Sequence, residues 1–175
     1  VGGIADLCGN IWEWSPGLRV VQGEIQVIAN NDAALNATDL SATSSAWKAI
    51  DGHTGLLINP TFTGSIAGGV YVPTTPKSVR YNTSGTANYT LVRTSGQSFE
   101  GMTNPGSTPV SAAALTVLKK YGLFPVASTG LGGDGFYLNV EGERLADRGG
   151  NWHAAAISGV FALNLNYARS NTHTT

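Results

Sequence analysis

The residues of this chain that could do chemistry are few and lie far apart. The three histidines, His53, His153 and His173, form no His-x-x-x-His or Glu-x-x-His pair, so a zinc site would need ligands from distant segments. The single cysteine, Cys8, excludes an intrachain disulfide and every multi-cysteine metal site. No neighbouring base or cation would activate its thiol, which favours a small buried side chain. The sequence therefore predicts no metal and no cofactor.

Three further patterns have a chemical and a structural interpretation. Glu13 lies between two tryptophans, where a carboxyl can serve as a general acid, but an outward-facing or arginine-paired side chain fits better. Residues 130–135 match the spacing of a dinucleotide-binding glycine motif, yet a strand-like segment follows where that motif needs a helix, so a plain turn is expected. Charges of alternating sign at 141–148 predict local ion pairs that order the loop before residue 149.

Composition favours one domain with a mostly neutral surface. The length of 175 residues and 42% hydrophobic residues suffice for one proper core. Only 12% of residues are charged, ten basic and eleven acidic without a run of either sign, which argues against nucleic-acid partners. No apolar stretch approaches the ~18 residues of a membrane span. The start at Val1 resembles neither a signal peptide nor a native start, so we expect a fragment of a longer protein.

The opening of the chain is typical of strands. Trp12 and Trp14 share one face of the first expected strand, and the burial of two indole rings would be a large stabilising contribution, so we expect both in the core. A turn at 15–17 should follow. Strands at 18–21 and 24–28 then flank a two-residue Gln-Gly loop, which predicts a hairpin.

The middle of the chain is irregular and is followed by one clear helix. Residues 30–108 alternate polar stretches with short apolar runs, which predicts an insertion of turns and short strands, with one helical turn at 44–51. Thr108 can then cap a helix with Pro109 in its first position. Apolar residues recur three and four apart until Gly122 ends the pattern.

The C-terminal part returns to strands and completes an α+β fold class. The glycine-rich loop 130–135 should lead into a strand at 136–140, and a last strand is expected at 160–166. One face of that last strand is apolar and the other polar, so its polar face is free for binding. The apolar face carries Phe161, Leu163 and Leu165.

Two short segments are specific to a known family. Residues 6–14, Asp-Leu-Cys-Gly-Asn-Ile-Trp-Glu-Trp, resemble the Gly-Asn-Val-Trp-Glu-Trp signature of the formylglycine-generating-enzyme branch of the C-type lectin fold. Residues 148–152, Arg-Gly-Gly-Asn-Trp, resemble its Arg-Gly-Gly-Ser-Trp signature. The stretch 149–175 further resembles the variable region of proteins diversified by retroelements, which in bacteriophages are often tail-tip adhesins such as tropism determinants.

The likeness to this phage group covers both ends of the chain and several points between. Residues 19–32, 44–50 and 121–123 also resemble it, whereas 52–108 do not. The resemblance implies a single C-type lectin-like domain over 1–175, with the irregular insertion 30–108 inside it and a variable ligand-binding region at 149–175. It also implies an N-terminal helical part and a final strand that these residues lack.

The variable-region resemblance implies which positions change. In such systems template adenines are mutated, so an asparagine codon can become His, Tyr, Ile, Thr, Ala, Ser, Asp, Gly and several other residues, but not Lys or Trp. Between the changeable positions stand residues expected to pack, namely Trp152, Gly159, Phe161, Leu163, Leu165 and Ala168. The expected ligand-binding residues are Asn151, His153, Ala154, Ala156, Ile157, Asn164, Asn166, Tyr167, Asn171, His173 and Thr175.

Three functions are compatible with these observations. The one we expect is a non-catalytic module at a phage tail-fibre tip or on a bacterial surface, which binds a bacterial cell-surface protein or glycan without a cofactor, without nucleic acid and without membrane insertion. Catalysis of the formylglycine-generating type implies a pair of cysteines in the later part of the fold, and this chain has only Cys8. The third is a structural fibre domain whose Asn-rich face packs on a neighbouring protomer, as in a homotrimer or another homo-oligomer.

Overall fold

Short strands joined by glycine-rich turns make up most of the fold, as the composition predicts. The computed structural model describes residues 9, 11–61, 77–93 and 98–171. Within them lie nine strands, one α-helix and two 3-10 helices, which are labelled η. These elements are β1 (Glu13–Val21), β2 (Glu24–Ile28), η1 (Ala29–Ala34), β3 (Trp47–Ile50), β4 (Leu57–Ile58), β5 (Arg80–Asn82), β6 (Thr90–Val92), α1 (Ala112–Lys120), β7 (Phe136–Leu138), β8 (Glu143–Arg148), η2 (Ala155–Ile157) and β9 (Leu163–Tyr167).

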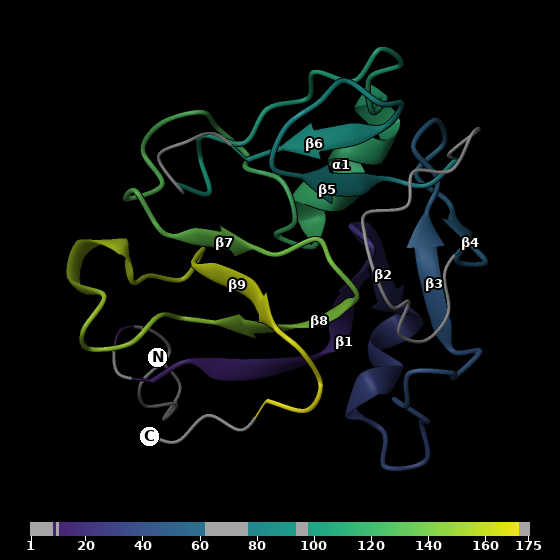
Figure 1. Ribbon diagram of the computed structural model, residues 1–175, viewed down its shortest axis with the longest axis horizontal. Helices are drawn as coiled ribbons and strands as arrows, with labels where there is room; N and C mark the ends of the chain where they lie inside the picture. The colour runs from purple at the N-terminus through teal and green to yellow at the C-terminus, as the bar shows by residue number, and fades with distance from the viewer. Residues whose placement is uncertain (1–8, 10, 62–76, 94–97, 172–175) are drawn as a thin grey trace.

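The strands join in a single mixed sheet. Its order is β4-β3-β2-β1-β8-β9-β7, and β5 pairs with β2 and with β6. Neighbouring strands are antiparallel except for the parallel pairs β7–β9 and β5–β6. In Figure 1, β1, β8, β9 and β7 lie side by side and run roughly horizontally. β2 and β3 lie on the right of the view and run at a steep angle to these four strands. This arrangement with one clear helix is an α+β fold.

The β1–β2 hairpin is confirmed in the predicted register. Residues 18–21 pair antiparallel with 24–27. The loop residues Gln22 and Gly23 have φ angles of 51° and 81°, the positive values that a type I′ hairpin turn requires. All residues of β2 are buried, so the hairpin lies in the middle of the molecule.

The first half of β1 differs from the prediction. Residues 15–17 do not turn the chain, because the strand continues through them while its pairing with β8 shifts between Trp14 and Arg19. This half pairs only with β8 and extends beyond β2 and the core. The prediction that both tryptophans are core residues is therefore wrong: Trp14 is 41% exposed and Trp12 is half-buried. Glu13 is exposed, as expected.

The segment 44–51, expected to contain a helical turn, forms strand β3 instead. β3 pairs with β2 on one side and β4 on the other, so sheet hydrogen bonds satisfy its backbone. Trp47 is almost fully buried in it, with the guanidinium carbon of Arg19 4.3 Å from the ring centroid. The indole Nε1 donates to the carbonyl of Ser41 at 3.0 Å. Burial of this one large ring outweighs the weak helical pattern.

The predicted helix is confirmed, but it begins later than its sequence signals indicate. Helix α1 starts at Ala112, and its cap is Ser111 rather than Thr108, because the Ser111 hydroxyl accepts from the Ala114 N–H at 3.1 Å. The helix ends before Gly122, whose φ is 65°. None of the described helices is long and apolar enough to cross a membrane.

The middle of the chain belongs to the core. The stretch 30–108 supplies strands β3 to β6 and several fully buried side chains, including Tyr81, Leu91 and Phe99. These pack in one cluster with Leu163 and Leu165 from β9. The core is therefore shared between segments that lie far apart in the sequence.

Among the charged residues at 141–148, for which local ion pairs are predicted, Glu143 instead pairs with residues far away in the sequence. Most of these charged residues lie in strand β8, and Glu143 bonds to distant partners: its Oε1 accepts from Nη1 of Arg19 and from Nη2 of Arg169, both at 2.7 Å. Burial raises the pKa of Glu143, but the hydrogen bonds from Arg169 and Arg19 outweigh it and hold that pKa below its ordinary value. A strand places adjacent side chains on opposite faces, so Glu143 and Arg144 do not face each other.

Candidate functional site

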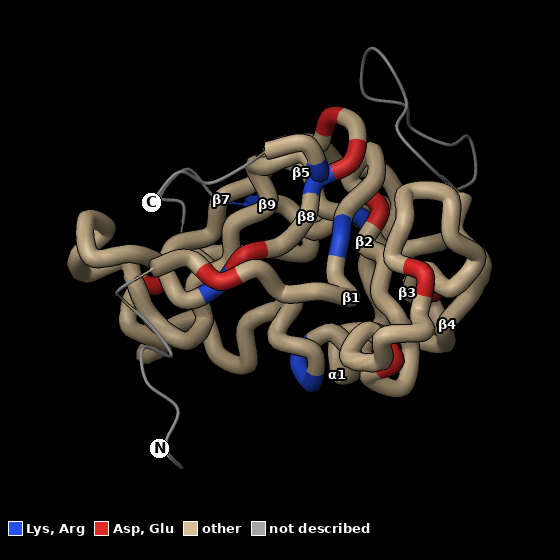
Figure 2. The backbone as a smooth tube through the Cα atoms, turned by 90° about the horizontal axis from the view of Figure 1, so that it is seen from below, with Lys and Arg blue, Asp and Glu red and all other residues tan. Residues whose placement is uncertain are grey.

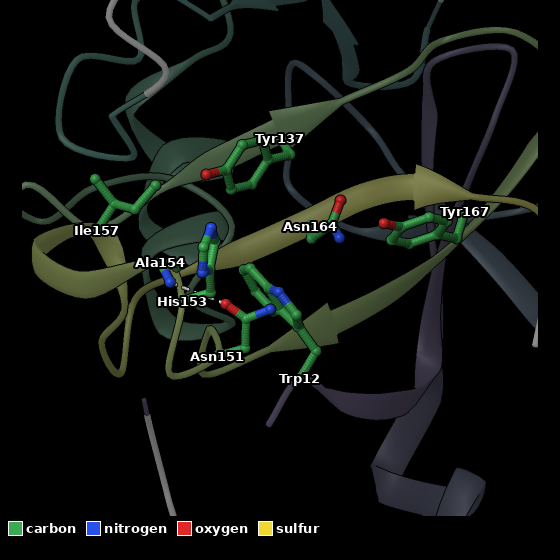
Figure 3. A pocket seen from close by; sticks show the side chains of 8 residues that line it. All are labelled: Trp12, Tyr137, Asn151, His153, Ala154, Ile157, Asn164 and Tyr167. Atoms are coloured by element: carbon green, nitrogen blue, oxygen red, sulfur yellow. Dashed lines mark hydrogen bonds between the residues drawn. The ribbon is translucent and has the colours of Figure 1, made fainter. Parts of the chain in front are cut away.

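An open pocket of about 350 Å³ lies over strands β7 and β9, between the start of β1 and the loop 149–162 (Figure 3). Its lining combines aromatic, amide and small side chains from three parts of the chain. The lining residues are Trp12, Tyr137, Asn151, His153, Ala154, Ile157, Asn164 and Tyr167. Six of these eight are residues that the sequence predicts for ligand binding. The structure thus brings most of the predicted site to one place.

Two aromatic rings form one corner of the pocket. Trp12 and Tyr137 have ring centroids 6.1 Å apart and planes at 83°, an edge-to-face contact. Tyr137 is the middle residue of the short strand β7, where it alternates with buried neighbours. Gly135 leaves room for it, because a Cβ at this position would lie 2.9 Å from the Tyr137 ring. Both rings are half-buried, so each keeps surface for a ligand.

Strand β9 supplies Asn164 and Tyr167. Asn164 is 4% exposed, so the prediction that the polar face of this strand is free is wrong at this position. Since β9 pairs with β8 on one side and with β7 on the other, its central residues are enclosed. The Asn164 Oδ1 accepts from the Asn166 N–H at 3.1 Å. The strand begins at Leu163, later than the predicted residue 160.

The loop after β8 is held by its own hydrogen bonds and presents four of the lining residues, one of which is Asn151. The Asn151 Oδ1 accepts from the Ala154 N–H at 3.0 Å, and the Asn151 carbonyl accepts from the Ser158 hydroxyl at 2.8 Å. Gly150 has a φ of 80° and packs so tightly that a Cβ would lie 2.4 Å from the Ser158 hydroxyl oxygen. These contacts position His153, Ala154 and Ile157 at the pocket.

The same loop is fixed to the sheet at two points. The Gly135 N–H donates to the Ile157 carbonyl at 2.8 Å. The Phe161 N–H donates to Oδ2 of the buried Asp134 at 2.8 Å, and Gly159 packs directly on that carboxylate. Exposed side chains therefore stand on an ordered backbone, which is the condition for a precise binding surface.

The residues expected to pack between the binding positions have mixed outcomes. Leu163 and Leu165 are fully buried, as predicted. Phe161 is only half-buried, stacked on Phe99 with centroids 6.2 Å apart. Trp152 is 77% exposed, so its assignment to the core is wrong. It lies in the loop between β8 and β9, where among the described residues its only ring contact is with His153.

Other predicted site residues lie elsewhere. Ala156, Asn166 and Asn171 are exposed but do not line the pocket. The Asn171 side chain caps its own turn, because its Oδ1 accepts from the Ala168 N–H at 3.1 Å. The remaining predicted residues, His173 and Thr175, lie outside the described residues, and so does Cys8.

Sequence reasoning missed Trp12 and Tyr137 as site residues. Aromatic residues two apart predict a buried face for Trp12, whereas Trp12 lies just before β1, whose first half extends past the core. The sequence does contain a signal for Tyr137. In a strand, Phe136 and Leu138 point to one face and Tyr137 to the other, so its polar hydroxyl indicates an outward position. Neither residue lies within the stretch 149–175 from which the site was predicted.

No Asp, Glu, Lys or Arg lines the pocket, and His153 is its one basic side chain. Across the described chain, charges are sparse and of mixed sign, as the red and blue segments in Figure 2 show. Within the described ranges no group of three or more His, Cys, Asp or Glu side chains could hold a metal ion. The arrangement offers aromatic surface and amide hydrogen bonds to a neutral ligand.

The chain matches no protein-family model and no curated protein.

Proposed function

We propose that this chain is a non-catalytic ligand-binding module of the retroelement-diversified type, built on a C-type lectin-like fold. Its role would be that of a receptor-binding domain at a phage tail-fibre tip, which binds a component of a bacterial surface. The observation that carries this proposal is that His153, Ala154, Ile157 and Tyr167, four positions where the family pattern has asparagine, surround one open pocket.

The packing supports the same proposal. A diversified protein must accept different side chains at its binding positions without losing its fold, so those positions must lie outside the core. His153 and Ile157 are exposed, and Ala154 and Tyr167 are half-buried. The intervening Leu163 and Leu165 are fully buried. These four changeable positions thus lie outside the core, while Leu163 and Leu165 between them lie inside it.

The proposal predicts that side chains at the pocket contribute to binding and little to stability. His153→Ala and Tyr167→Ala should each weaken binding to bacterial cells by on the order of 1–2 kcal/mol, with a melting temperature close to that of the unaltered protein. Fluorescently labelled protein and a panel of bacterial strains, read by flow cytometry, provide the measurement.

Matched controls exist for both variants. His53 and Tyr121 are exposed and lie outside the pocket, so His53→Ala and Tyr121→Ala should leave binding unchanged. Unfolding of the Tyr167→Ala variant would contradict the proposal, and so would cell binding that is indifferent to both pocket variants. An oligomer in which His153 and Tyr167 are buried between protomers would favour the structural fibre domain instead.

A genetic observation tests the diversification directly. The proposal requires a near-copy of the codons for residues 149–175, different from them only at adenines, beside a reverse transcriptase gene. Differences at other bases, or no copy in the source genome, would remove the retroelement from the proposal while leaving the pocket as a binding site.

A further inference from the structure

We infer that the pocket binds a neutral sugar unit of a bacterial surface glycan. This inference rests on the proposed function and narrows its ligand from any surface component to one chemical class. A pyranose ring combines an apolar face of C–H groups with a rim of hydroxyls, each of which can donate and accept hydrogen bonds. The lining of the pocket provides counterparts for both features.

The apolar part of the lining is the corner formed by Trp12 and Tyr137. Because these rings meet edge to face, they do not cover each other as a closed stack would. Ile157, which is 39% exposed, and Ala154 extend this surface on the side of the loop. A flat ligand with an apolar face can pack there, and Tyr and Trp provide large contact area at low cost in conformational entropy.

The polar part consists of two oriented amides. A backbone N–H donates to the side chain of Asn151 and another to that of Asn164, and since an N–H can only meet an acceptor, the contacted atom in each is the oxygen. In both residues the amide nitrogen, with its two donors, makes no hydrogen bond to another described residue. Asn164 is only 4% exposed, and it lines the pocket. Figure 3 shows the Asn151 nitrogen turned toward Trp12.

Charge and size favour a sugar over other ligands. Phosphates and carboxylates are bound most strongly by Arg or Lys, and neither lines the pocket. The volume of about 350 Å³ is near the lower end of small-molecule sites, which suits a monosaccharide or the end of a glycan chain. A peptide could not pair with β9 as an added strand, because β9 already has a partner on each side.

The test follows the tryptophan indole signals of ¹⁵N-labelled protein by NMR during titration with methyl α-mannopyranoside, methyl β-glucopyranoside, methyl β-galactopyranoside and N-acetylglucosamine. At least one sugar should shift the Trp12 indole signal and leave that of the buried Trp47 unchanged. Trp12→Ala should weaken binding at least about tenfold. Asn151→Asp keeps the acceptor for the Ala154 N–H but removes the donor, so it should also weaken binding.

Two control variants match these substitutions. Trp14→Ala alters an exposed tryptophan two residues further along the chain, outside the pocket. Asn139→Asp changes an amide whose Oδ1 likewise accepts a backbone N–H, at 2.9 Å from Glu141, and this residue also lies outside the pocket. Both should bind the sugar as the unaltered protein does. Equal weakening by a control and its pocket counterpart would overturn the inference.

Treatment of whole cells separates this inference from the proposed function. If the ligand is a glycan, mild periodate oxidation of the cells should abolish binding and protease treatment should not. No indole shift with any of the four sugars, together with cell binding that resists periodate and is lost after protease, overturns the sugar inference and leaves the proposed function in place. Cell binding that is indifferent to Trp12→Ala and His153→Ala overturns both.

Discussion

Glu143 shows how one side chain connects distant parts of the chain. Its carboxylate accepts from the fully buried Arg19 on β1 and from Arg169 just after β9. The side chain of Arg169 is 37% exposed, so solvent weakens that pair, whereas the pair with Arg19 is shielded. Arg19 also donates to Gln26 and packs on Trp47, so the loss of Glu143 would leave a buried cation without its counter-ion.

We predict that Glu143→Gln lowers the free energy of unfolding at neutral pH by on the order of 3 kcal/mol. The folded pKa of Glu143 lies below its ordinary value, so this carboxylate stabilises the fold above about pH 4.3, and the stabilisation is lost as pH falls through the folded pKa. The difference between the two proteins should therefore shrink in acid. Urea denaturation from pH 7 to pH 3 measures it.

Glu141→Gln is the control for this substitution, because Glu141 is exposed two residues away in the sequence. It should change the unfolding free energy by less than about 0.5 kcal/mol. A Glu143→Gln protein as stable as the control at pH 7, or a difference that grows on acidification, would contradict the role assigned to this carboxylate.

At the scale of single residues, sequence patterns locate the site better than they predict burial. The positions assigned from the variable-region resemblance gather at the pocket because the loop and β9 are consecutive in sequence. The exposure of Trp14 and Trp152 could not be predicted, since the size and hydrophobicity of a tryptophan indicate burial and only the ends of the sheet show what covers it. Asn164 shows the opposite error: its polar side chain predicts exposure, yet it is 4% exposed. Strand β9 lies between β7 and β8, and the local sequence around Asn164 does not show this pairing.

The loop 149–162 is the element that decides whether the site keeps its shape. Gly159 contacts the Asp134 carboxylate so closely that a Cβ would lie 2.3 Å from Oδ1. The same carboxylate holds the Phe161 N–H. A methyl group at this position would push Asp134 away from its partner and shift the start of β9.

Gly159→Ala should therefore lower the free energy of unfolding by about 1–3 kcal/mol, the usual cost of overpacking. The neighbouring Val160 is 61% exposed, so Val160→Ala should have almost no effect. Urea denaturation of both variants gives the comparison. Equal stability of Gly159→Ala and the unaltered protein would contradict this prediction, because it would mean that Asp134 can move aside without lowering the free energy of unfolding.

Elements defined by local sequence are predictable in this chain, and elements defined by distant pairing are not. The Gln22-Gly23 hairpin and helix α1 follow from turn chemistry and apolar spacing within a few residues. Strand β3 has only four residues and is fixed by its neighbours β2 and β4. The pairing of β8 with β1 joins segments more than a hundred residues apart, which no local pattern encodes.

At the scale of the whole molecule, the middle of the chain and its C-terminal part share one core. Leu91 from β6 and Leu163 from β9 belong to the same buried cluster, together with Leu118 from α1. The 30–108 stretch resembles an insertion in sequence, but its side chains fill space that the terminal strands alone would leave empty. Such sharing favours unfolding in a single cooperative transition.

We predict that Leu91→Ala and Leu163→Ala each lower the stability of the entire molecule by about 2–5 kcal/mol. Both residues are fully buried, whereas Leu56 is 67% exposed, so Leu56→Ala serves as the control and should unfold like the unaltered protein. Far-UV circular dichroism and tryptophan fluorescence, followed through urea denaturation, should give coincident single transitions for every variant. Trp47 reports on the middle of the chain and Trp12 on the pocket, so two separate transitions, with only one of them moved by Leu91→Ala, would show that the middle segment folds independently of the binding site.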